Sequence, residues 1–182
     1  LLLAGVAVNA GISALTLIAT IRVSKDNYQF VTAWLAGTIW GTTWQHVFLL
    51  LPWLICLIPA VLLRGRALEV LELGDEIAVG LGVRLKRTQL FILICAVCLA
   101  AASVSIAGSI SFVGLIAPHI ARQFTGKKNN QTLVMTALIG GILLLFSDIL
   151  ARVILPSGEM AAGIIVSLIG APYFILQLLK KS

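Results

Sequence analysis

Few side chains in this sequence could carry out chemistry, and most of them stand singly in apolar surroundings. Cys95 and Cys98 have the CxxC spacing of a redox or metal site, but no further Cys or His is near them. His119 follows Pro118 and has no second ligand in view. We therefore expect small buried cysteines, a locally hydrogen-bonded histidine and no metal centre.

Asp148 and Arg152 are the other candidates, and they lie four residues apart near the end of an apolar segment. An acidic side chain in such a segment suggests a functional role. An acid and an arginine at this spacing also share one helix face, where they can form a structural ion pair. The sequence leaves both interpretations open.

Sequence motifs of enzymes are absent. No HExxH string occurs, and the two histidines, His46 and His119, are not paired with a nucleophile or an acid. Gly126-Lys127 lacks the upstream glycine of a phosphate-binding loop, because Ala121 occupies that position. We therefore expect that the chain is not an enzyme and binds no cofactor directly.

The composition predicts the environment of these residues. Of the 182 residues, 60% are hydrophobic and 11% are charged, and the mean hydropathy is +1.08, whereas about a quarter of residues are charged in soluble domains. The net charge of +6 comes from residues at the ends of apolar runs, which is a topology signal rather than a nucleic-acid site. An all-α polytopic protein surrounded by membrane lipid is predicted.

A helix needs about 20 residues to cross a bilayer. We use this length to divide the apolar runs into membrane crossings. The uncharged run 88–121 allows either one long helix or two crossings with a turn at Gly108. The turn would place ten of the thirteen basic residues on one side, leaving Arg22, Lys25 and Arg152 opposite, which favours it. We expect crossings at 1–21, 45–63, 88–107, 112–126 (short and broken at Pro118), 130–150 and 160–179, and a short interfacial helix at 28–36.

The long polar stretch 64–87, called the polar hairpin below, interrupts this pattern. Two short helices are expected in it, at 67–73 and 75–81, joined at Gly74 and with Asp75 as the cap of the second. Ile77, Ala78 and Leu81 would then share one apolar face within a charged rim. A surface for another protein and a solvated loop are both compatible with this composition.

Several strings in order carry a resemblance to a known family: LLLAGVAVNA at the start, LxLGxxxAxxLGV in the polar hairpin, GSISFVGLIAPHIAR, SDILAR and GAPYFILQLL. The chain resembles the FecCD-type permeases, the membrane subunits of ABC importers for iron-siderophores, haem and vitamin B12. By this resemblance it is similar to the last six of ten helices, a C-terminal portion of a longer subunit. One departure is that Met160-Ala161 follows Glu159, where the family usually has Leu-Pro.

The resemblance also implies partners and site residues. The hairpin and the C-terminus would both lie in the bacterial cytoplasm, and the hairpin would couple to a separate ATPase subunit that hydrolyses ATP. Arg152 with Asp148 would dock an extracytoplasmic binding protein. A second permease subunit, identical or different, would complete the pathway. The coupling residues are Gly74, Asp75, Glu76, Ala78, Leu81 and Gly82, and the signature residues are Gly108, Gly114, Pro118, His119, Arg122, Gly170 and Pro172.

The function expected from the resemblance is import of a ferric-siderophore chelate across the cytoplasmic membrane. Haem and vitamin B12 remain alternatives, because few fixed charges line the spans. A secondary transporter is a further alternative, although its ionisable groups tend to lie at the membrane midplane. Asp148 instead lies near a helix end.

Overall fold

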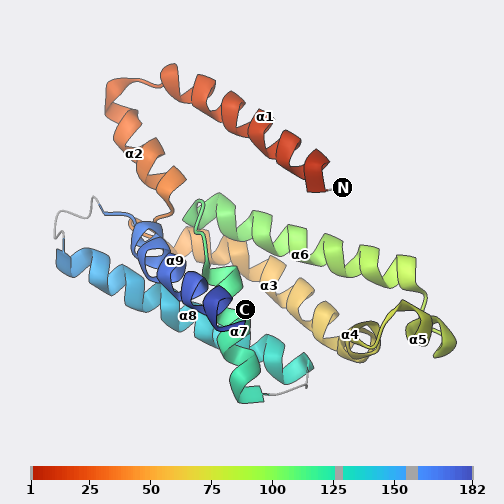
Figure 1. Ribbon diagram of the computed structural model, residues 1–182. Coiled ribbons are helices and arrows are strands. Elements are labelled where there is room, and N and C mark those ends of the chain that lie inside the picture. The colour runs from red at the N-terminus through yellow and green to blue at the C-terminus, as the bar shows by residue number, and fades with distance from the viewer. Residues whose placement is uncertain (1, 126–128, 155–159, 182) are drawn as a thin grey trace.

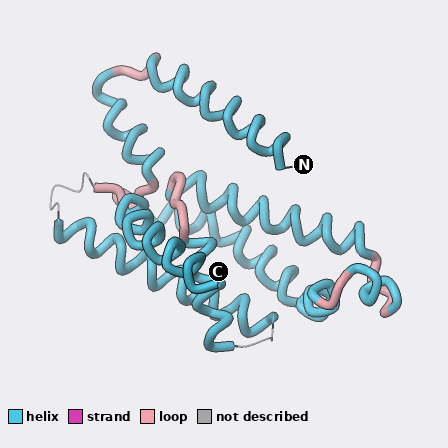
Figure 2. Tube along the Cα trace, viewed as in Figure 1, coloured by secondary structure: helices cyan, strands magenta, loops and turns pink. Residues whose placement is uncertain are grey.

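The computed structural model describes residues 2–125, 129–154 and 160–181. Within these ranges the chain consists of helices and loops without a strand (Figures 1 and 2), so the predicted all-α class is confirmed. Glu159, Lys127 and Lys128 lie outside the described residues. The helices are α1 (Leu2–Ile21), α2 (Lys25–Ala36), α3 (Trp44–Leu63), α4 (Gly65–Glu72), α5 (Asp75–Gly80), α6 (Leu85–Ala107), α7 (Val113–Thr125), α8 (Asn129–Ile154) and α9 (Ala162–Lys181).

Among the described residues, four helices are long and apolar enough to cross a bilayer, and they belong to α1, α3, α6 and α8. A shorter apolar stretch, Ala162–Gln177, lies in α9. Helix α7 has 13 residues, or about 20 Å at 1.5 Å per residue, less than a hydrocarbon core of about 30 Å. The chain is a polytopic helical membrane protein, and the total of six crossings stays a prediction.

The long helices run between two ends of the molecule (Figure 1). At the hairpin end, α3 and α7 end and α6 and α8 begin. Helices α4 and α5 connect α3 to α6 at this end. At the opposite end, called the Arg152 end, α6 and α8 end and α3 and α9 begin. Helices α7, α8 and α9 pack together, α3 packs on α6, and α4 contacts both α3 and α8.

The buried core lies mainly among α7, α8 and α9 and consists mostly of small side chains. Ala121 is 0% exposed, Ala162 1% and Val166 0%. Small residues let helix backbones approach closely, which stabilises helix packing in a membrane where apolar burial gives little driving force. By contrast, none of residues 3–21 of α1 is buried, so this apolar helix is left for lipid or for other parts of the assembly.

A glycine junction of Gly37, Gly108 and Gly163 fixes the Arg152 end. The backbone N–H of Gly163 donates to the carbonyl oxygen of Gly37 at 2.8 Å. Gly108 has a φ of +72°, and a Cβ there would overlap the carbonyl oxygen of Trp34. Only glycine combines this conformation with such a close approach. The expected turn at Gly108 is confirmed, because α6 ends at Ala107 and α7 begins at Val113.

The expected break at Pro118 is wrong. Pro118 lies inside one continuous helix, α7. A proline at this position removes a single hydrogen bond, the one to the carbonyl oxygen of Gly114 four residues earlier. Because α8 and α9 both pack against α7, tertiary contacts hold the helix together across the missing bond.

Candidate functional site

The polar hairpin forms two short helices, as the sequence predicted, and three of their four bounds differ by one or two residues. Helix α4 covers Gly65–Glu72 and α5 covers Asp75–Gly80. The expected cap is wrong: Gly74 occupies the N-cap of α5 with a φ of 109°, and Asp75 is the first helical residue. Asp75 and Glu76 nevertheless lie in the first turn, where acidic side chains stabilise a helix through its dipole.

Helix α5 ends in a Schellman motif centred on Gly82. The N–H of Gly82 donates to the carbonyl oxygen of Val79 at 2.9 Å, and the N–H of Val83 donates to that of Ala78 at 3.0 Å. Gly82 has a φ of +80°, the left-handed conformation that the residue after a helix C-cap commonly adopts. The sequence expectation that Gly82 needs a conformation unfavourable to side chains is confirmed.

The exposed apolar residues of the hairpin differ from the expected set, which was Ile77, Ala78 and Leu81. Ala78 is 0% exposed, so it does not share an exposed face with Ile77 and Leu81. In a Schellman motif the residue two beyond the C-cap, here Val83, commonly packs against the position that Ala78 occupies, which accounts for the burial of Ala78. The exposed apolar side chains, surrounded by exposed Asp75 and Glu76, are Leu73, Ile77, Val79 and Leu81.

Two contacts hold the hairpin to the long helices. The guanidinium of Arg64 lies over the ring of Phe91 in α6, 4.7 Å from its centroid. Gly65 is buried, and a Cβ there would overlap the Asn130 side chain at the start of α8. The hairpin therefore lies directly against both α6 and α8.

At the opposite end, Asp148 and Arg152 form the ion pair that their spacing predicted. The Nε–H of Arg152 donates to Oδ2 of Asp148 at 2.7 Å. The arginine side chain is 49% exposed and that of Asp148 is 16% exposed. The ion pair itself is thus confirmed, while the docking role stays a prediction.

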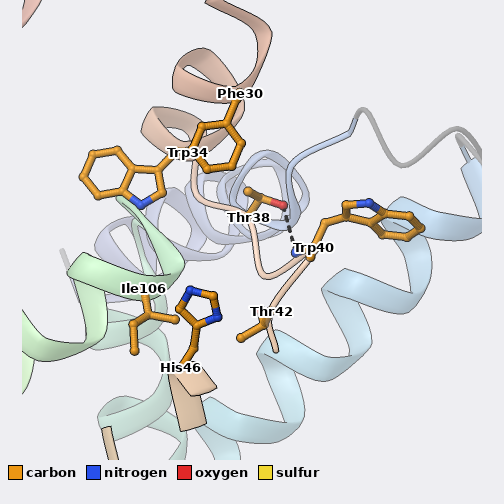
Figure 3. A pocket seen from close by; sticks show the side chains of 8 residues that line it. Phe30, Trp34, Thr38, Trp40, Thr42, His46 and Ile106 are labelled. Carbon is orange, nitrogen blue, oxygen red and sulfur yellow. Dashed lines mark hydrogen bonds between the residues drawn. The ribbon is translucent and has the colours of Figure 1, made fainter. Parts of the chain in front are cut away.

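Trp40 adds a contact that the sequence did not predict. The guanidinium of Arg152 lies over its ring, 4.5 Å from the centroid. Figure 3 shows the indole extending from the loop between α2 and α3 towards α8, away from Phe30 and Trp34. Trp40 also lines a pocket of about 80 Å³, whose other lining residues are Phe30, Trp34, Thr38, Gly41, Thr42, His46 and Ile106.

His119 in α7 contacts two side chains of α9. Its ring lies in hydrogen-bond contact with the side-chain amide nitrogen of Gln177, which is 2.9 Å from Nδ1. The ring of Tyr173 approaches it edge-on, with centroids 6.2 Å apart. Gln177 and Tyr173 both lie in α9, so the expected hydrogen-bonding role of His119 is confirmed, and the bond joins α7 to α9 instead of being local.

The remaining signature residues are not gathered at one place. A Cβ on Gly170 would lie 2.6 Å from Cβ of Phe112, so α9 passes close to the loop before α7. Gly114 and Pro172 are exposed on α7 and α9. Arg122 lies exposed in the last turn of α7, at the hairpin end.

The cysteines agree only in part with the sequence expectation, because Cys95 is buried but Cys98 is not fully so. Cys95 is buried, Cys98 is half-buried and Cys56 is exposed, and all three are free thiols. Across the described ranges, no three His, Cys, Asp or Glu side chains gather in a way that could hold a metal ion.

Fold and site together define a class, that of polytopic helical membrane proteins with a compact polar hairpin at one end and an arginine site at the other. The FecCD transport family model matches residues 1–180. The chain therefore belongs to this family.

Individual relatives agree with this assignment. The chain is 41% identical to the iron(3+)-hydroxamate import system permease protein FhuG of Bacillus subtilis (strain 168), over 100% of this chain and 54% of the relative. It is 39% identical to the Fe(3+) dicitrate transport system permease protein FecC of Escherichia coli (strain K12), over 96% of this chain and 52% of the relative. The chain thus spans about half the length of these curated relatives.

A solved structure has the same fold. It is described as a metal-chelate type ABC transporter in an inward-facing conformation, and it matches with a TM-score of 0.86 at 28% sequence identity. The match covers 98% of this chain and 59% of the solved chain.

Proposed function

We propose that this chain is part of the permease subunit of a binding-protein-dependent ABC importer that carries a ferric-siderophore chelate across the bacterial cytoplasmic membrane. The observation that carries the proposal is the family match over residues 1–180. Relatives named for iron(3+)-hydroxamate and Fe(3+)-citrate import support the ferric chelate as cargo. A second permease subunit, identical or different, would complete the pathway.

The polar hairpin is the proposed contact with the ATPase subunit. Four apolar side chains of the hairpin are 52% to 62% exposed, namely Leu73, Ile77, Val79 and Leu81. They lie at the end of a membrane protein, where water reaches them and exposure of apolar groups is unfavourable. Burying them against a partner would be favourable, and the acidic rim would fix the register of the contact. Arg64 contacts α6 and Gly65 lies close to α8, and ATP-driven motion of the hairpin would reach the membrane helices through these contacts.

The orientation follows from charge. Arg64, Arg84, Lys86, Arg87 and Arg122 all lie at the hairpin end, where the connections between helices are short. Basic residues in short loops are retained on the cytoplasmic side. This charge distribution supports the proposal that the hairpin and the C-terminus lie in the cytoplasm and that the Arg152 end faces outward.

The Arg152 end is the proposed docking site for the extracytoplasmic binding protein. An outward arginine runs against the positive-inside bias, which calls for a specific role. A guanidinium grips a carboxylate with two parallel hydrogen bonds, and such a contact at the rim of an interface speeds capture and depends on salt. Asp148 orients the guanidinium through the 2.7 Å contact to Nε.

The cargo class is tested by binding. The full-length permease, assembled with its ATPase and incubated with the loaded binding protein, is expected to retain ferric hydroxamates or ferric citrate and to discriminate against haem and cobalamin by about tenfold or more, that is, by about 1.4 kcal/mol. A complex that retained cobalamin or haem in preference to every ferric chelate of the panel would overturn the assignment of the cargo while leaving the permease assignment intact.

A further inference from the structure

Trp40 makes a contact at the Arg152 end that ion pairing alone does not explain. It belongs to the loop between α2 and α3, whereas Arg152 lies in α8, and its ring faces the guanidinium at 4.5 Å. We propose that Trp40 is a positioning residue for Arg152, which holds the guanidinium ready to receive a carboxylate of the binding protein. This inference rests on the docking role proposed above for Arg152.

The geometry leaves one part of the guanidinium available. Its Nε–H is taken by Asp148 at 2.7 Å, and its central carbon lies over the Trp40 ring. Among the described residues, the two terminal nitrogens have no hydrogen-bond partner, and the side chain is 49% exposed. A carboxylate binds an arginine side by side through two N–H groups. The edge formed by the terminal nitrogens is therefore the one that a partner carboxylate can reach.

The contact with Trp40 favours docking because it orders a flexible side chain in advance. A solvent-exposed arginine samples many rotamers, and fixing them at the moment of binding reduces affinity. The ion pair with Asp148 constrains the Nε side of the guanidinium, and the Trp40 ring constrains the position of its central carbon. The two contacts together define the direction of the remaining edge, which neither does alone.

The backbone under Trp40 is itself anchored. The loop begins at the glycine junction and ends at Thr43, whose N–H donates to Nδ1 of His46 at 3.1 Å in a capping box. Between these points, the N–H of Trp40 donates to Oγ1 of Thr38 at 3.1 Å, as the dashed line in Figure 3 marks. The indole is therefore presented to α8 by a fixed loop, as a positioning role requires.

The test measures docking of the binding protein encoded with the permease to the full-length permease–ATPase complex in nanodiscs. Arg152→Glu is expected to weaken docking at low salt, and a Glu→Arg change at the matching position of the binding protein to restore part of it. Trp40→Leu is expected to weaken docking by about two- to fivefold, the range of an exposed cation–π contact. In an Arg152→Ala background, Trp40→Leu is expected to have no further effect.

Trp44→Leu is the matched control. Trp44 is 76% exposed at the start of α3, and its ring pairs with that of Phe48 in the same helix. Its substitution is expected to leave docking unchanged. Fluorinated tryptophans at position 40 provide a measurement that keeps the shape of the side chain, because fluorine weakens the negative face of the ring. Affinity is expected to fall with each added fluorine.

The outcomes separate the two proposals. If Arg152→Glu leaves docking unchanged, the docking role of Arg152 fails and the inference fails with it. If Arg152→Glu weakens docking but fluorination of Trp40 does not, the inference about Trp40 alone is overturned. The same holds if Trp40→Leu weakens docking equally with Arg152 present and with Arg152→Ala.

Discussion

Leu81→Asp is expected to dissociate the ATPase from the full-length permease and to abolish transport without unfolding the membrane helices. Leu81 is 62% exposed at the C-cap of α5, so an aspartate is tolerated by the free subunit. Burying a leucine side chain in a partner is worth about 2 kcal/mol, and a buried unpaired carboxylate adds a further cost. The ATPase affinity is therefore expected to fall by roughly thirtyfold or more.

Leu81→Met is the matched control, since it keeps an apolar side chain of similar volume and is expected to retain most of the affinity. ATPase binding is measured on purified membranes, and the thermal unfolding midpoint of the permease shows whether the fold is kept. If Leu81→Asp binds the ATPase and transports at the parental rate, the exposed apolar face of the hairpin is not the contact surface.

Gly108→Val is expected to have the largest effect on stability. With a φ of 72° and a ψ of −164°, Gly108 lies in a backbone region essentially confined to glycine, where a side chain costs about 1 to 3 kcal/mol. A Cβ would also overlap the carbonyl oxygen of Trp34, so the end of α2 would have to move away from the glycine junction. We expect a total loss of about 3 kcal/mol or more, seen as a lower unfolding midpoint and less folded protein in the membrane.

The control for this substitution is Gly141→Ala in α8, where a Cβ would meet nothing within 4 Å of this chain. Alanine is favoured over glycine inside a helix by up to about 1 kcal/mol, so stability is expected to be unchanged or slightly higher. A Gly108→Val permease with the parental unfolding midpoint would show that α2 does not approach Gly108 closely.

Local sequence patterns predicted much of this molecule. Uninterrupted apolar runs indicated the long helices, Gly108 indicated the turn between α6 and α7, and the spacing of Asp148 and Arg152 indicated their ion pair. Each of these features depends on residues within a few turns of one another. Periodicity and charge placement are sufficient for such features.

Contacts between distant segments were not predicted. Trp40 meets Arg152, and Gln177 meets His119, only because the helices pack as they do. The sequence around Trp40 carried no information about its partner. The break expected at Pro118 was wrong for a related reason, since packing against α8 and α9 outweighs a local helix-breaking preference.

The central claim, that this chain is part of an ATP-driven importer of ferric chelates, is tested most directly by uptake into proteoliposomes. The full-length permease is reconstituted with its ATPase, and radiolabelled ferric hydroxamate or ferric citrate is supplied with the loaded binding protein. Uptake is expected to require ATP hydrolysis and the binding protein, and to persist when ionophores collapse all ion gradients. Uptake driven by an imposed ion gradient, without the ATPase, would contradict the account.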